Sequence, residues 1–220
     1  TDNFLLYKLI ISFQWAFTAI GTFSLHLSED SPAITAATQK YLTAFSAESA
    51  GLSDFFNLFP EPSVAAHIFH LGETARAVVF LQERLPGLMR ESGPLLQALA
   101  RTIPPGAPGS TGELQKIILL HAAPEPDKGL AAASPTEELF KTLFQGDASS
   151  QDSACFAVEA YDRFRDQTGE SYPPLLFQGV LRPAEVLAVQ RKKRAAAKEQ
   201  FIAALAAIIA QPRQEAPLEK

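Results

Sequence analysis

The sequence predicts an α+β fold that is dominated by helices and has a β-hairpin or one long strand near its N-terminus. Residues 10–28 alternate between apolar and polar side chains and contain no charged residue, which is typical of a half-buried strand. From Ser31 onward, apolar residues recur at intervals of three and four between prolines and glycines, which indicates a multi-helix bundle. The 220 residues, 47% of them hydrophobic, are enough to enclose a sizeable core.

The predicted strand has one aromatic face. Its odd-numbered positions are mostly bulky and apolar, and they include Phe13, Trp15, Phe17 and Phe23. Isoleucine, phenylalanine, tryptophan and threonine, which make up much of the segment, all favour strands. A single strand of this length would be unusual, so we expect a hairpin turn near residues 19–21. Because few other segments resemble strands, the aromatic face is expected to pack on the helices or on another chain.

The sequence also allows two other interpretations of this segment. Gln14, Thr18, Thr22 and His26 are spaced by four and would form one narrow polar stripe on a soluble helix. A membrane-spanning helix needs about 20 predominantly apolar residues, and the same polar side chains interrupt the segment. We therefore do not expect an integral membrane protein.

The later elements are expected to be helices with recognisable starts and stops. Ser31 followed by Pro32 supplies an N-cap and a proline at the first helical position. Ser134 and Glu137 form a capping box, with a proline directly after the serine. The expected helical segments are 33–48, 53–59, 63–85, 88–103, 113–122 (a short helix or a buried strand), 135–145, 150–168 and 183–210.

A segment rich in proline and glycine divides the chain. Residues 104–112 read PPGAPGSTG and are expected to form a linker or loop. They separate a part with the strand or hairpin and several helices, 1–103, from a helical part, 113–210. We expect these two parts to share one core. The polar residues 211–220 are expected to form a flexible tail.

Composition limits the classes of function. The chain has one cysteine, Cys155, which excludes an internal disulfide and fits a reducing, cytoplasmic compartment. The net charge of −5 argues against nucleic acid as the main partner. A secretory signal is not expected, because the sequence has no basic segment followed by an apolar stretch and a small-residue cleavage site. Neither Cys155 nor Thr1 has the surroundings of a nucleophile, so no catalytic residue is predicted.

One group of residues could bind a metal. His67, His70 and Glu73 lie at three-residue intervals, which places them close to one face of a helix. Two imidazoles and a carboxylate could hold zinc or iron. The sequence offers no further ligand in a recognised motif, so we favour histidines at the edge of an apolar stripe and predict neither a metal site nor a cofactor.

The strongest electrostatic feature is a run of four basic residues, Arg191, Lys192, Lys193 and Arg194. The segment 182–198 holds six basic residues and one acidic residue, a local net charge of +5. Four consecutive cations cover every side of a helix, so the run is expected to be solvated. It could contact phosphate groups or an acidic partner, although no aromatic residues alternate with the cations for base stacking.

These observations favour a non-catalytic protein–protein interaction or scaffold (adaptor) domain, which forms a homo-oligomer or binds another protein. The first alternative is an enzyme or sensor with a helical pocket around His67, His70 and Glu73. The second is a peripheral binder of anionic membranes or nucleic acid through 191–194. The expected partner-binding residues are Phe13, Trp15, Phe17, Phe23, Arg191, Lys192, Lys193 and Arg194.

Overall fold

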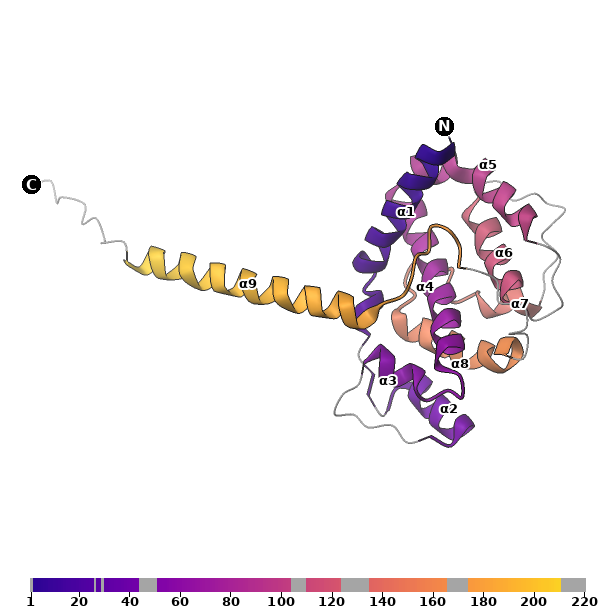
Figure 1. Cartoon of the computed structure of the whole chain (residues 1–220), viewed down its shortest axis with the longest axis horizontal. Helices are drawn as coiled ribbons and strands as arrows, with labels where there is room; N and C mark the ends of the chain where they lie inside the picture. The colour runs from indigo at the N-terminus through magenta and orange to yellow at the C-terminus, as the bar shows by residue number, and fades with distance from the viewer. Residues whose placement is uncertain are drawn as a thin grey trace, which may run out of the picture. The chain divides into compact units, whose positions relative to one another are not determined.

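The computed structural model describes residues 2–25, 27–28, 30–43, 51–103, 110–123, 135–165 and 174–210. Across these residues there are helices and turns but no strand, so the fold is all-helical and the expected α+β fold with an N-terminal hairpin or strand is wrong. The elements are α1 (Asp2–Ala19), the 3-10 helix η1 (Thr22–Ser24), α2 (Pro32–Tyr41), α3 (Leu52–Phe56), α4 (Pro62–Arg84), α5 (Pro86–Thr102), α6 (Thr111–Ala122), α7 (Pro135–Leu139), α8 (Ser150–Phe164) and α9 (Pro183–Ala210) (Figure 1).

The chain divides into two compact units, Thr1–Leu181 and Arg182–Lys220. The first unit contains α1 to α8 and the second contains α9. Within the first unit, α6 and α8 pack against α4, although the proline- and glycine-rich segment separates them from it in the sequence. Most of that segment (104–109) and the expected tail (211–220) lie outside the described residues.

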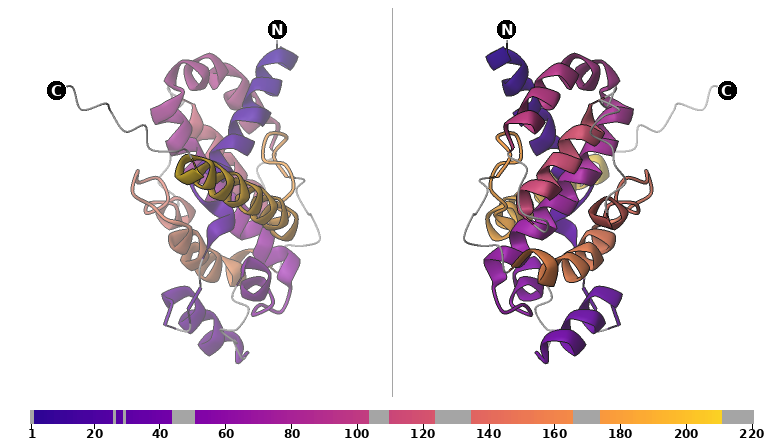
Figure 2. Two further views of the ribbon diagram at one scale, coloured as in Figure 1. Left: turned by 90° about the vertical axis from the view of Figure 1, so that its left-hand side faces the viewer. Right: turned by 90° about the vertical axis from the view of Figure 1, so that its right-hand side faces the viewer.

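Helix α4 forms the centre of the first unit (Figure 2). Its residues 68–78 are all buried, because α1, α5, α6 and α8 pack around it. Gly72 lets α8 approach closely, since a Cβ atom at this position would lie 3.0 Å from the Phe156 ring. Because the helix is covered on every side, its polar residues Glu73, Thr74 and Arg76 are buried together with its apolar ones.

Residues 2–19 form a helix because their buried positions follow the helical period. Leu9, Phe13, Ala16 and Phe17 are almost completely buried, and their spacing of four, three and one is that of one helix face. A strand would need a partner strand for its backbone hydrogen bonds, and the described neighbours of this segment are helices. The chain leaves α1 at Gly21, which adopts the left-handed conformation (φ 75°) that favours glycine.

Two helices are long and apolar enough to cross a membrane by length and composition alone. They correspond to α1 with η1 (Asn3–Ser24) and to α4 (Pro62–Arg84). The core helices of soluble proteins meet the same criterion, and 72% of the α4 segment is buried inside the protein. The α1 segment is 22% buried and is the more exposed of the two.

Several of the expected helix boundaries are confirmed. Helix α2 begins at Pro32 and α9 spans Pro183–Ala210, both as expected. Residues 111–122 form a helix, which resolves the alternative of a buried strand. Pro86 opens α5, where we expected a break before the next helix. Ser134 of the expected capping box lies outside the described residues.

Candidate functional site

Helix α1 carries a line of exposed apolar side chains on the side opposite its buried face. Phe4, Tyr7, Ile11 and Trp15 are 64, 59, 50 and 47% exposed. Their spacing of three, four and four residues places them along one side of the helix, and we call them the α1 stripe. A helix at a protein surface normally carries polar residues on its solvent side. The α1 stripe is therefore a candidate binding surface.

The α1 stripe borders a groove between α1 and the start of α5. The groove has a volume of about 400 Å³, and its lining includes Phe4, Tyr7 and Ile11 together with Leu85 and Leu88. Its polar lining residues include Lys8 and Glu91, whose Nζ and Oε2 atoms are 3.5 Å apart and link the two helices. The groove thus combines apolar walls with one ion pair.

The exposed apolar surface continues from α1 onto α4. The rings of Trp15 and Phe80 lie 5.1 Å apart between centroids, and the Phe80 ring is half-buried. The Arg84 guanidinium carbon lies 5.8 Å from the centre of the Phe80 ring. Trp15 is the only tryptophan of the chain, so this surface has a natural fluorescent reporter.

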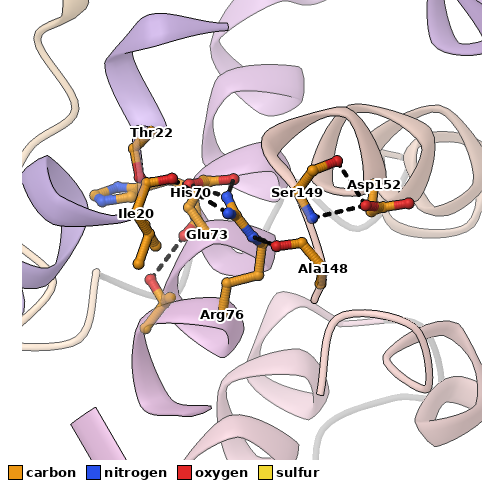
Figure 3. A network of polar contacts seen from close by, with 9 residues as sticks. Ile20, Thr22, His70, Glu73, Arg76, Ala148, Ser149 and Asp152 are labelled. Carbon is orange, nitrogen blue, oxygen red and sulfur yellow. Dashed lines mark hydrogen bonds and ion pairs between the residues drawn. The ribbon is translucent and has the colours of Figure 1, made fainter. Parts of the chain in front are cut away.

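A buried polar network lies under the C-terminal end of α1 (Figure 3). Arg76 of α4 donates from Nη1 to both carboxylate oxygens of Glu73, at 2.6 and 2.8 Å. Its Nη2 donates to the carbonyl of Ile20 (3.2 Å) and its Nε donates to the carbonyl of Ala148 (3.0 Å). The Thr22 hydroxyl donates to the second Glu73 oxygen. Charged hydrogen bonds therefore join the end of α1, α4 and the segment before α8.

Two of the three residues of the possible metal site have other partners, whereas Nε2 of His67 is buried without a hydrogen bond. Glu73 is bound by Arg76 and Thr22, and the His70 ring packs 5.1 Å from the Phe17 ring. Burial, and to a lesser extent the nearby His67, lowers the pKa of His70 to about 3. Among the described residues, no group of three or more His, Cys, Asp or Glu side chains is arranged to hold a metal ion. Glu73 and His70 therefore contribute to the packing and hydrogen bonding of the core.

The helical period separates the four aromatic residues that a strand would have placed on one face. Phe13 and Phe17 lie in the core, where Phe13 packs against Phe177 at 4.4 Å between ring centroids. Phe23 is half-buried, and Trp15 alone belongs to the exposed stripe. Phe4 and Tyr7 were not predicted because they precede the alternating segment 10–28, and Ile11 stands at the start of that segment but was not among the expected binding residues. Their spacing of three and four was the signal that could have found them.

The basic cluster lies in the middle of α9. Residues 191–194 and Lys198 are exposed. Five apolar side chains that follow in the same helix are 47–76% exposed, and they are Phe201, Ile202, Leu205, Ile208 and Ile209. Arg182, just before the helix, is paired with Glu185 at 3.3 Å. The second unit therefore presents cations and apolar side chains on one continuous helix.

Cys155 of α8 does not have the surroundings of a reactive thiolate. Its side chain is half-buried. Burial raises the pKa of its thiol, and the carboxylates of Asp152 and Glu159 raise it further. The thiol form is therefore favoured, whereas nucleophilic cysteines need a stabilised thiolate.

Comparisons of the chain with protein-family models, with curated proteins and with solved structures gave no significant match.

Proposed function

We propose that the chain is a non-catalytic interaction module that binds an apolar helical segment of a partner protein on the α1 stripe and its adjoining groove. The observation that carries the proposal is the line of four exposed bulky apolar side chains, Phe4, Tyr7, Ile11 and Trp15, beside a groove of about 400 Å³. Contiguous exposed apolar surface of this kind marks interaction sites. Helix-in-groove recognition uses a similar combination of a groove and apolar anchors at helical spacing.

The composition of the surface supports this proposal. Tryptophan and tyrosine are enriched among the residues that contribute most to protein–protein binding, and Trp15 and Tyr7 stand in the line. The Lys8–Glu91 ion pair at the groove can supply polar contacts around an apolar centre.

Contacts within the first unit hold α1 in place. Phe13 and Phe17 anchor its inner side in the core, and Arg76 holds the carbonyl of Ile20 just beyond its end. A surface that is already ordered loses less conformational entropy on binding than a mobile one does. The α1 stripe is therefore suited to bind as a rigid face.

Site-specific photo-crosslinking tests the proposal. Tyr7 is replaced by a photoreactive phenylalanine derivative in the full chain, and the crosslinked product is measured by mass in the native cell extract. We expect one discrete adduct that disappears when Ile11→Glu places a carboxylate in the stripe. The control places the same reactive group at Leu42, which is 91% exposed at the end of α2.

The adduct mass also separates the two kinds of partner. An adduct of twice the chain mass, together with a dimer in light scattering, indicates self-association. An adduct of another mass indicates a different protein. Equal adducts from Tyr7 and Leu42, or an adduct from Tyr7 that Ile11→Glu leaves unchanged, contradict binding on the α1 stripe.

A further inference from the structure

The C-terminal part of α9 is apolar on every side. Its bulky residues Phe201, Ile202, Leu205, Ile208 and Ile209 cover about one third of the helix circumference. The other residues of 201–209 are all alanine, so no side chain in this segment can hydrogen-bond to water. A helix that is apolar all round is normally buried in a protein core or in a membrane. Here the five bulky side chains are 47–76% exposed.

The cations of α9 continue the line of these apolar residues. Arg191, Arg194 and Lys198 precede Phe201 at intervals of three and four, and the same intervals continue to Leu205 and Ile208. All three cations are exposed. One side of the helix is therefore basic over its middle turns and apolar over its last turns.

Self-association of α9 fits this pattern poorly. Two parallel copies would place Arg191, Arg194 and Lys198 opposite the same cations, and like charges at such positions repel. Two antiparallel copies that overlap over the whole helix would place 191–194 beside 199–202, which partly desolvates four cations with only Glu199 as a counter-charge. A second copy of α9 is therefore not the occupant that we favour.

An anionic bilayer matches both parts of the helix. The helix holds five basic and two acidic residues, a net charge of +3. Clusters of Lys and Arg beside an apolar segment bind anionic lipid headgroups, and acyl chains can surround an apolar helix on all sides, as a protein groove cannot. Residues 201–209 rise about 14 Å, roughly half of a hydrocarbon core of about 30 Å. That length suits insertion into one leaflet.

We propose that α9 binds anionic lipid bilayers, with 191–198 on the phosphate headgroups and 201–209 inserted among the acyl chains of one leaflet. This proposal is independent of the α1 stripe, since it uses a different unit of the chain. It can fail while the protein interaction on α1 stands, and the reverse also holds.

Vesicle flotation with the full chain tests the proposal. Vesicles of phosphatidylcholine are compared with vesicles of phosphatidylcholine and phosphatidylserine. We expect phosphatidylserine to strengthen binding by about tenfold or more, and added salt to weaken it, because each cation near the surface contributes to the attraction. Failure of the chain to float with the phosphatidylserine vesicles would overturn the proposal.

Two variants separate the contributions of charge and insertion. Replacing all five cations of 191–198 by glutamine should reduce binding to phosphatidylserine vesicles to the level seen without that lipid. The double variant Phe201→Ala, Ile208→Ala should weaken binding to both kinds of vesicle. Vesicles with phosphatidylserine should still bind this variant more strongly than vesicles without it. The matched controls Arg182→Gln and Val189→Ala change an exposed cation and an exposed apolar residue outside the proposed contact, and binding should not change.

Insertion has a spectroscopic signature that other partners cannot give. Phe201→Trp in a Trp15→Phe background leaves one tryptophan in the apolar segment. We expect its emission to shift to shorter wavelength on vesicles, with quenching by brominated acyl chains. Flotation without such quenching would contradict insertion. Equal binding of α9 to soluble DNA or polyglutamate under the same salt conditions would likewise overturn a bilayer as the occupant.

Discussion

The Arg76 guanidinium and the Glu73 carboxylate form a paired contact inside the protein, with Nη1 at 2.6 and 2.8 Å from the two oxygens. The Glu73 side chain is fully buried and that of Arg76 is 7% exposed. Since Arg76 also binds the carbonyls of Ile20 and Ala148, the pair connects the end of α1 with the segment before α8. The network therefore links the segment just beyond α1 to the core beneath it.

Removing Arg76 should destabilise the fold strongly. In Arg76→Met, Glu73 stays buried and keeps only the hydrogen bond from Thr22. An uncompensated buried charge costs about 3 kcal/mol or more. We expect a loss of that size in the free energy of unfolding, measured by urea titration with circular dichroism.

The control for this variant is an exposed ion pair. Lys141 and Glu138 are 3.0 Å apart, with side chains 69 and 72% exposed. Because such pairs contribute roughly 1 kcal/mol or less, Lys141→Met should change stability little. Similar losses of unfolding free energy in the two variants would show that the buried Arg76–Glu73 pair contributes no more to stability than the exposed pair does.

Stability should fall as the solution becomes acidic, and His70 should be one cause. Its pKa is lowered from 6.5 to about 3 in the folded protein, first by burial and second by His67. Between these two values the unfolded chain binds more protons than the folded chain does. The stability is therefore complete above about pH 6.5 and is lost progressively as the pH falls toward 3, by up to about 1.4 kcal/mol per pH unit from this residue.

The contribution of His70 can be isolated by His70→Leu. Leucine cannot titrate, so the urea midpoint of this variant should fall less steeply between pH 7 and pH 5 than that of the natural chain. Some slope should remain, because burial also lowers the pKa values of His67 and His121. An unchanged slope in the variant would rule out His70 as a source of acid sensitivity.

Gly179 should not tolerate a side chain. It adopts φ 71°, and an added Cβ atom would lie 2.8 Å from Nε2 of Gln14, which donates to the carbonyl of Gln178. We expect Gly179→Ala to lower the free energy of unfolding by about 1–2 kcal/mol. Gly87→Ala is the opposite control, since Gly87 lies in a helix with open space around it and alanine should stabilise it by about 0.5–1 kcal/mol. Equal effects at both glycines would contradict this account.

The sequence allowed the starts of several helices after Ser31 to be predicted because these starts are local, whereas the expected segments 33–48 and 135–145 end earlier, at Tyr41 and Leu139. Proline at a first helical position depends only on the backbone of a few residues, and Pro32 and Pro183 begin helices as expected. The apolar stripe of α4 was also found from its spacing. These features need no knowledge of what lies next to them.

The N-terminal segment could not be assigned in this way. Its apolar content is high enough that both a period of two and a period near 3.6 fit parts of it, as with Phe13, Trp15 and Phe17. The outcome depends on tertiary contacts, because α1 lies against α4 and α5 rather than beside a strand. The candidate surface changed for the same reason, since the helical period moved Phe13 and Phe17 into the core and left Trp15 outside.

Phe13 and Trp15 provide a direct test of this difference. On a strand the two side chains would share one face, whereas on α1 they are about 200° apart around the axis. Phe13 is fully buried and packs against Phe177, so Phe13→Ala should lower the free energy of unfolding by about 4 kcal/mol. Trp15 is half-exposed and contacts Phe80, so Trp15→Ala should lower it by only about 1 kcal/mol. Equal losses of unfolding free energy in the two variants would indicate that the two rings share one face, which would contradict the helix.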